Sequence, residues 1–388
     1  MRKQVVCLVK KLLSVFISVT IILCCFPVKT NAIDFSLSAQ SAILIDADTL
    51  QVLYAKSEHQ KRGIASTTKI LTSLIALEYG EPQKEVVATK EAVSVEGTSI
   101  GLKAGDKITL KALVYGMLLE SGNDAANVTA FAISKNITAF SSLMNEYAEK
   151  IGMKSSNFTN PSGLTDENHY STAYDMALLT SVAIKNPVFR KICSTTSATI
   201  DFGTPEISRN LSNHNRLLSE YDGVFGVKTG YTKASGRCLV TACERDSVTL
   251  IAVTLNAYDD WNDHKKLFDY GFSLYDKIID VNLNEIKIPV VCSAPGFVTV
   301  DLAYEHNVTV RDNAETEIFV EQFLYPPVKK GDVVGCVVFK DSENKIIKEI
   351  PLVACENAKA LYDEIEEISF FQKIKNFIKG LSKKKWQK

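Results

Sequence analysis

Hydrophobic residues from 38 to 272 follow two spacings, one typical of strands and one typical of helices. Apolar runs at 42–46 and 51–55 flank a short polar turn, which predicts a β-hairpin. Apolar residues three and four positions apart predict a helix over 67–79, and Gly80 is a common stop signal. The same spacing predicts four further helices, at 110–120, 124–134, 140–151 and 172–185.

Two more strands are predicted at 237–242 and 248–256, joined by a Glu-Arg-Asp turn. Because strands stand at both ends of this stretch and helices lie between them, one sheet can use both ends. We therefore expect a single α/β (α+β) domain over residues 33–278.

The pattern changes after residue 279. Short β-runs separated by polar turns follow at 285–291, 297–302, 307–310, 315–319 and 333–340. No helical stripe lies between them, so we expect a small all-β domain over 279–360. It holds no group of residues that we would interpret as catalytic.

The two ends of the chain carry membrane-related signals. Residues 1–32 have a basic start, an apolar stretch at 12–28 and small residues at 30–32, which is the order of a secretory signal peptide. An uncleaved anchor is the alternative. Residues 361–388 predict an amphipathic helix that has seven lysines and no acid after Glu367. Such a helix suits an anionic membrane surface and is too short to span a bilayer, although a helix docked on its own domain is the alternative.

Charge and cysteine content narrow the classes of function. The 44 basic and 45 acidic residues nearly cancel, but the stretch 33–367 holds only 32 of the basic residues and has a net charge of −13. An acidic body is a poor binder of phosphates, so we expect no nucleic-acid partner. The six cysteines after residue 32 are never two or three positions apart, which excludes the common zinc and redox spacings.

Ser66-Thr-Thr-Lys69 opens the helix predicted at 67–79. The positive end of a helix dipole favours an anionic serine oxygen, and Lys69 lies one turn further on the same face. A neutral Lys69 amine could take the Ser66 proton and so activate a nucleophile. The Ser-x-x-Lys pattern also occurs at 342–345 and 382–385, but only the first match begins a strongly apolar helix.

Ser121-Gly-Asn123 lies between two predicted helices. Its hydroxyl and amide suit a proton relay and an amide-binding group. The alternative is structural, because Asn123 or Asp124 would cap the following helix well.

Lys228-Thr229-Gly230 occurs once in the chain. Gly226 and Gly230 are typical of a strand that lets another backbone approach closely. A lysine and a hydroxyl suit a substrate carboxylate, although an ordinary edge strand is the alternative.

The three motifs in this order resemble those of the penicillin-binding protein and serine β-lactamase superfamily, and most closely those of low-molecular-weight D-alanyl-D-alanine carboxypeptidases. The resemblance extends through the sequence segments around the motifs, at 43–55, 64–75, 119–126, 158–176, 214–218 and 223–238. It implies an antiparallel sheet covered by helices and serine acyl transfer without a metal or other cofactor. The substrate would be a peptidoglycan stem peptide ending in D-Ala-D-Ala, β-lactams would inhibit, and the enzyme would work at the outer face of the cytoplasmic membrane.

The resemblance also implies a role for each motif residue. Ser66 would be the acylated nucleophile, Lys69 its general base, and Ser121 the group that passes a proton to the leaving amine. Asn123 would hold the substrate amide. The remaining substrate-binding residues would be Lys228, Thr229, Gly230 and Tyr231, where Lys228 and Thr229 attract the terminal carboxylate and the backbone N–H groups of Ser66 and Tyr231 form the oxyanion hole.

Two positions depart from the family pattern. Relatives often carry Arg where this chain has His214, and again where Asp260 precedes Trp261. Both arginines help to hold the carboxylate, so we expect weaker carboxylate binding here and unaltered acylation chemistry.

Three other functions remain open. A class A β-lactamase would carry a Glu-x-x-Leu-Asn loop, which is absent between Ser121 and Lys228, although Glu167 lies in the corresponding stretch. A non-catalytic penicillin sensor would need a signalling span. A related esterase or transpeptidase would differ only in the acceptor that attacks the acyl-enzyme.

Overall fold

The computed structural model describes residues 36–361 except 276, 282, 284–285, 304–306, 311–313 and 341–343. The signal peptide predicted at 1–32 lies outside the described residues, as does the amphipathic segment from 362 onward. Within the described residues, no helix has the length and apolar character needed to cross a membrane.

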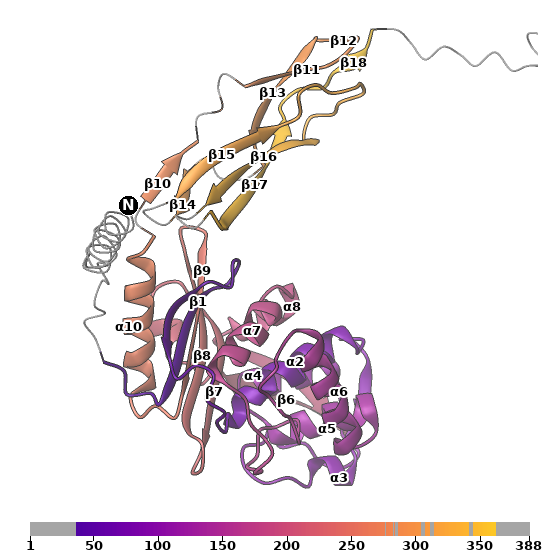
Figure 1. The fold of residues 1–388 in the computed structure, drawn as a ribbon. Helices are drawn as coiled ribbons and strands as arrows, with labels where there is room; N and C mark the ends of the chain where they lie inside the picture. Colours follow the sequence, from indigo (N-terminus) through magenta and orange to yellow (C-terminus); the bar gives the residue numbers. More distant parts are fainter. Residues whose placement is uncertain are drawn as a thin grey trace, which may run out of the picture. The chain divides into compact units, whose positions relative to one another are not determined.

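A five-stranded sheet organises the first region (Figure 1). Its order is β2-β1-β9-β8-β7 and every pairing is antiparallel. Strand β1 pairs with β9, so both ends of the segment share one sheet, as predicted. The strands are β1 (Ser41–Asp46), β2 (Val52–Lys56), β7 (Val224–Thr232), β8 (Gly236–Arg245) and β9 (Val248–Leu255).

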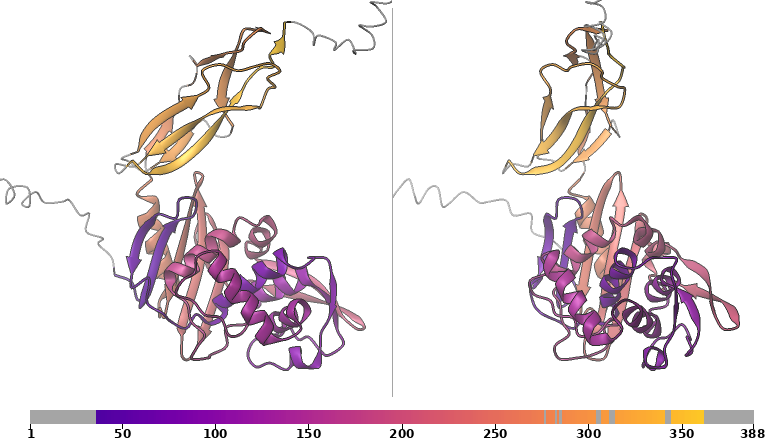
Figure 2. Two further views of the ribbon diagram at one scale, coloured as in Figure 1. Left: turned by 45° about the vertical axis from the view of Figure 1, so that its right-hand side comes forward. Right: turned by 90° about the vertical axis from the view of Figure 1, so that its right-hand side faces the viewer.

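Helices cover both faces of this sheet (Figures 1 and 2). Helix α10 (Asp260–Phe272) lies on one face. On the other face, α7 (Ala173–Ala183), α8 (Pro187–Cys193) and α2 (Lys69–Glu78) contact the sheet. A second layer of helices packs on α2, namely α4 (Leu110–Leu118), α5 (Asn123–Ser134) and α6 (Ile137–Lys150). This arrangement confirms the predicted α/β class with its antiparallel sheet and helical cover.

Shorter elements complete the region. They are η1 (Ala65–Thr68), β3 (Glu85–Val87), α3 (Lys90–Val93), β4 (Lys107–Thr109), β5 (Ser197–Gly203), β6 (Glu206–Ser212) and α9 (Leu217–Glu220). β5 and β6 form a hairpin that the sequence analysis did not predict.

Helix α2 is the centre of the core. Every residue from Lys69 to Leu77 is buried, including Ile70 and Leu74. Burying one such aliphatic side chain stabilises the fold by about 1.5–3 kcal/mol, which holds the start of the helix in place. The buried polar residue Thr72 donates its hydroxyl to the carbonyl of Pro161 at 2.7 Å, which ties the helix to the 160–170 loop.

Among the described residues after 276, the regular secondary structure consists of strands and no helix, as predicted. It has a hydrophobic core of its own that includes Val298, Val337, Phe339 and Leu352. Its main sheet has the order β11-β13-β17-β16-β15, and two small sheets pair β10 with β14 and β12 with β18. The strands are β10 (Lys277–Asp280), β11 (Lys287–Pro289), β12 (Ser293–Ala294), β13 (Phe297–Leu302), β14 (Asn307–Val310), β15 (Glu315–Val320), β16 (Val333–Lys340), β17 (Ile346–Ala354) and β18 (Lys359–Ala360).

Candidate active site

Ser66 lies in the 3-10 turn η1, directly before α2. Its neighbour Ala65 has a φ of +46°, an uncommon conformation for a residue with a side chain. Such backbone strain persists only where the surrounding structure enforces it, and it is concentrated at functional sites. The Ser66 side chain is partly exposed, so a substrate can reach it.

Lys69 is fully buried and its Nζ is surrounded by three oxygen atoms. They are Ser66 Oγ at 2.9 Å, Asn123 Oδ1 at 2.8 Å and the carbonyl of Ser162 at 2.7 Å. Burial, and then the nearby Lys228 ammonium, hold the pKa of Lys69 well below its usual range, while Asp124 acts in the opposite direction. The structure therefore places a lysine with a lowered pKa within hydrogen-bond distance of the Ser66 hydroxyl.

Ser121 and Asn123 sit at the start of α5. Ser121 is buried, with a φ of +62°, and its carbonyl accepts a hydrogen bond from the Thr98 hydroxyl at 2.6 Å. The N-cap of α5 is Gly122, whereas the Asn123 side chain accepts from Lys69 and donates to the carbonyl of Glu96 at 2.7 Å. The alternative of Asn123 as a simple helix cap is therefore wrong.

Lys228 and Gly230 come from the edge strand β7. Burial lowers the pKa of Lys228 to about 7, and its Nζ donates to the carbonyl of Thr229 at 3.0 Å. A Cβ at Gly230 would lie 3.0 Å from the Ser66 backbone nitrogen, so this strand passes very close to Ser66. Close approach is the reason that we expected a glycine here.

One cavity of about 340 Å³ brings the predicted residues together. Five of them line it, namely Ser66, Ser121, Thr229, Gly230 and Tyr231. The other three, Lys69, Asn123 and Lys228, are buried and lie outside its lining. His214, Asp260 and Trp261 also line the cavity, and so do two residues that sequence reasoning did not select, Thr98 and Arg237.

Arg237 supplies a cation that the sequence analysis did not assign. Its Nη2 and Nε donate to Oδ1 of the buried Asp260 at 2.8 and 2.9 Å. Arg237 stands opposite Tyr231 in the β7–β8 pairing, so the predicted strand at 237–242 could have placed it beside the last motif. The two positions that depart from the family pattern, His214 and Asp260, therefore line a cavity whose lining also includes Arg237.

His214 faces the same cavity and pairs with Glu120 at 3.7 Å. Burial and Lys228 lower its pKa, while Glu120 opposes the shift. The imidazole is therefore a weaker cation near neutral pH than the arginine that relatives often carry there.

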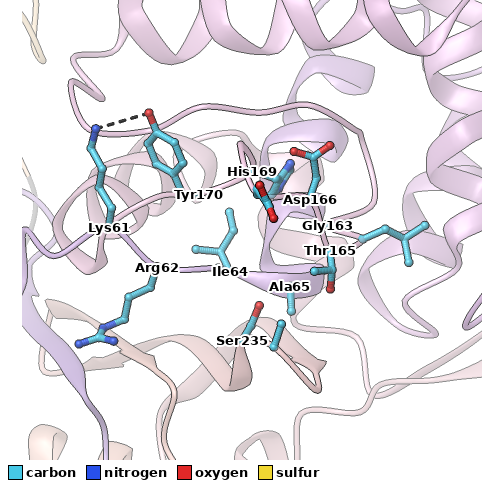
Figure 3. A pocket seen from close by; sticks show the side chains of 14 residues that line it. Lys61, Arg62, Ile64, Ala65, Gly163, Thr165, Asp166, His169, Tyr170 and Ser235 are labelled. Atoms are coloured by element: carbon cyan, nitrogen blue, oxygen red, sulfur yellow. Dashed lines mark hydrogen bonds between the residues drawn. The ribbon is translucent and has the colours of Figure 1, made fainter.

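The 160–170 loop supports the site from behind. Asn160 Oδ1 accepts the backbone N–H groups of Ser162, Gly163 and Leu164, which fixes the carbonyl that receives Lys69. Glu167 is exposed and lines a different cavity, the one drawn in Figure 3, whereas Ser66 lines the first cavity. This placement counts against a deacylating role for Glu167.

Within the described residues, no group of three or more His, Cys, Asp or Glu side chains is arranged to hold a metal ion. The Ser66 hydroxyl accepts a hydrogen bond from the Lys69 amine, which also donates to the Asn123 side-chain amide.

These features are typical of a serine hydrolase that has a lysine beside its reactive serine. The family profile of the S11 peptidases, described as D-alanyl-D-alanine carboxypeptidase, matches residues 28–259. The match covers more than half of the chain, and the chain belongs to this family of serine-type carboxypeptidases, the low-molecular-weight penicillin-binding proteins.

Relatives support the same assignment. The chain is 31% identical to D-alanyl-D-alanine carboxypeptidase DacF of Bacillus subtilis over 83% of its own length and 86% of that protein. It is 34% identical to DacB2 of Mycobacterium tuberculosis over 61% and 83% of the two chains.

Solved structures agree with the fold. The D-alanyl-D-alanine carboxypeptidase DacD of Francisella tularensis superposes with a TM-score of 0.57 at 28% identity, covering 84% of this chain and 95% of that one. The Streptomyces K15 DD-transpeptidase gives a TM-score of 0.59 at 30% identity, covering 62% of this chain and 99% of that one.

Proposed function

We propose that this carboxypeptidase removes the terminal D-Ala of peptidoglycan stem peptides through an acyl-enzyme on Ser66. The observation that carries the proposal is the position of the buried Lys69 amine, 2.9 Å from Ser66 Oγ. Water would hydrolyse the acyl-enzyme, and β-lactams would acylate the same oxygen.

The contacts of Lys69 suggest how the proton moves. A neutral amine has two N–H donors and one lone pair. The carbonyl oxygens of Asn123 and Ser162 can only accept, so they would take the two N–H groups. The lone pair would then face the Ser66 hydroxyl, which would lose its proton to Lys69 as Oγ attacks the substrate carbonyl.

The next step is collapse of the tetrahedral intermediate. The backbone N–H groups of Ser66 and Tyr231 would hold its oxyanion, a contribution often worth about 3–4 kcal/mol. Ser121, at the wall of the cavity, would pass the proton to the departing amine, and buried Lys228 would keep that hydroxyl oriented. The carbon–nitrogen bond breaks, D-Ala leaves, and the ester on Ser66 remains.

The substrate's terminal carboxylate needs donors at the other end of the cavity. Thr229 offers a hydroxyl and Arg237 a guanidinium, both in the cavity lining. Because Asp260 already balances part of the Arg237 charge, this pair would orient a carboxylate more than it would attract one over a distance.

The setting of the enzyme would be the outer face of the cytoplasmic membrane, where its polymer substrate lies. Residues 1–32 would export the chain and the basic segment 361–388 would bind the anionic surface. We further propose that 33–278 act as the catalytic domain and 279–360 as a separate β-domain.

Replacing Ser66 with Ala tests the proposal. Because the nucleophile is removed, intact-mass analysis should show no benzylpenicillin adduct, and D-Ala release from a D-Ala-D-Ala peptide should cease. Ser382→Ala, in another Ser-x-x-Lys match, is the matched control and should keep both activities. An adduct on the Ser66→Ala protein would refute the assignment, and rapid penicillin turnover by the wild type without an adduct would favour a β-lactamase.

A further inference from the structure

Large apolar side chains lie exposed on the β-region, the strands after residue 276, close to the point where the described chain ends. Strands β12 and β18 pair at this end (Figure 1). Four side chains there are between 39% and 71% exposed, namely Val291, Phe323, Tyr325 and Leu361. Their segments are neighbours, because the N–H of Val291 donates to the carbonyl of Leu324 and the N–H of Leu361 to that of Cys292, each at 2.9 Å. We call these four residues the apolar patch.

The alternation of side chains explains why the patch faces solvent. Val290 and Leu324 form a bridge between their segments, and both pack on the core of the β-region. Successive side chains of an extended segment point to opposite sides, so Val291, Phe323 and Tyr325 point away from that core. The rings of Phe323 and Tyr325 contact each other edge to face, with 5.5 Å between their centroids. They form one apolar surface.

Exposed lysines lie next to the patch. Val328 and Ala358 form an antiparallel bridge and are both buried. By the same alternation, the adjacent side chains of Lys329 and Lys359 point outward, and both are exposed. Lys330 is exposed as well. The outer surface at this end of the β-region therefore combines apolar side chains with three cations.

The sequence beyond Leu361 contains groups that complement this surface. Residues 362–367 hold four acids, namely Asp363, Glu364, Glu366 and Glu367. Residues 368–381 hold six large apolar side chains at helical spacing, namely Phe370, Phe371, Ile374, Phe377, Ile378 and Leu381. The acids complement the three lysines in charge, and the apolar side chains that follow them suit the patch.

The connection between the patch and these apolar residues is short. Leu361 belongs to the patch, and seven extended steps of about 3.3 Å place Ile368 within about 23 Å of it. A short connection of this kind gives an intramolecular contact an effective concentration in the millimolar range. A modest apolar surface is then enough for binding, whereas a separate partner at micromolar concentration would need a much larger one.

A membrane is a less suitable occupant of the patch. If the patch lay on an anionic bilayer, the four acids of 362–367 would be held at the same surface, which repels them. The acids are instead attracted to the lysines beside the patch. Charge thus favours the chain's own segment over lipid at this position.

We propose that the apolar patch binds the apolar side of residues 368–381 whenever this segment is not on a membrane. The acids of 362–367 pair with Lys329, Lys330 and Lys359 in that state. Docking on the patch and binding to lipid exclude each other, because both use the same apolar side chains. The β-region would then cover the membrane-binding segment in water and release it to lipid. This inference goes beyond the proposed carboxypeptidase function and does not depend on Ser66.

Hydrogen exchange followed by mass spectrometry tests the docking. The two proteins are residues 33–388 and the same chain truncated after Leu361. Without lipid, we expect backbone amides at 321–325 to exchange at least threefold more slowly in the longer chain, because the docked segment covers them. Phosphatidylglycerol vesicles should raise the exchange of the longer chain to that of the truncated one.

Three results would overturn the inference. Equal exchange in the two proteins without lipid would show that the segment does not cover the patch. Slower exchange of the truncated chain on adding vesicles would assign the patch to lipid. Protection that increases with protein concentration would assign it to a second copy of the chain.

A double variant of the patch tests the competition with lipid. If the segment is docked about two thirds of the time, Phe323→Ser/Tyr325→Ser should release it and bind phosphatidylglycerol vesicles about threefold more tightly than the wild type. The control is Val87→Ser/Ile207→Ser, at similarly exposed apolar positions outside the β-region, and should keep the wild-type affinity. Equal or weaker vesicle binding by the patch variant would contradict the docking. D-Ala release by both variants checks that they are folded, and its absence from the wild type would count against the proposed function alone.

Discussion

At the scale of single residues, the two buried lysines determine the proton chemistry. Lys69 and Lys228 are both fully buried, and both pKa values lie below their usual range. Burial lowers both pKa values, and the Lys228 ammonium lowers the pKa of Lys69 further. Because the two groups interact, their titration is a property of the pair.

Lys228→Met should move the acid limb of the acylation pH profile to higher pH. Removing the neighbouring ammonium makes protonated Lys69 less costly, so the Lys69 pKa rises and its neutral form appears only at higher pH. We also expect the maximal rate to fall about 100-fold, because Ser121 would lose the partner that we propose keeps its hydroxyl oriented. Stopped-flow acylation by a chromogenic cephalosporin between pH 5 and 10 measures both effects.

Lys233→Met removes the same charge at an exposed position of the adjoining turn and is the control. An acid limb that stays in place in Lys228→Met would show that the two lysines do not interact electrostatically. A shift in both variants would point to a general effect of net charge.

Sequence reasoning at this scale succeeded where residues form short motifs. Ser66 and Lys69 are one helical turn apart, so their contact could be predicted from local spacing. Arg237 and Asp260 are 23 positions apart, and only the course of the chain from β8 through β9 to α10 brings them together. No local pattern contains that information.

At the scale of elements, the 160–170 loop and η1 form one tightly packed unit. Gly163 has a φ of +83°, and a Cβ there would lie 1.8 Å from the carbonyl oxygen of Ala65. The buried His169 adds a second link, because its Nε2 lies 2.8 Å from the Thr68 hydroxyl, which itself donates to that carbonyl. The backbone before Ser66 is therefore held from two directions.

Gly163→Ala should lower the free energy of unfolding by about 3 kcal/mol, since the unfavourable φ and the overlap with Ala65 add together. Gly105→Ala is the matched control, because Gly105 has a φ of +92° and nothing within 4 Å of an added Cβ. It should cost about 1 kcal/mol from its φ alone. Urea denaturation followed by tryptophan fluorescence compares the two, and equal losses would contradict close packing at Gly163.

Strong periodicity made some elements predictable, and competing signals hid others. Helices α2, α4, α5 and α6 have apolar stripes, α7 is apolar around most of its surface, and each was predicted to within a few residues. Helix α10 was missed because charged and polar residues dominate its sequence and few apolar side chains pack on the sheet. Strand β17 contains Pro351, and a proline inside an apolar run argues against a strand.

At the scale of the whole molecule, charge is separated along the chain. The stretch 33–367 carries a net charge of −13, and the segment that follows carries seven lysines without an acid. An acidic body is repelled by an anionic surface, so attraction to such a surface has to come from the basic end.

Truncation after Glu367 should release the protein from vesicles that contain anionic lipid. Losing seven lysines removes about 1 kcal/mol of attraction each near the surface. Co-sedimentation with such vesicles measures binding, and D-Ala release from a soluble peptide serves as the internal control, since Ser66 is untouched. Unchanged sedimentation of the truncated protein would contradict the role of this segment.

The open edge of β7 has a consequence for discrimination. Backbone N–H and C=O groups are the same in every peptide, so a strand edge pairs with any extended chain and carries no information about its side chains. In the proposed mechanism, selectivity must then come from the side chains that line the cavity beside this edge, among them Arg237 with its partner Asp260. An inhibitor that copies only the substrate backbone would be tight but indiscriminate, whereas one that also contacts these side chains would be selective.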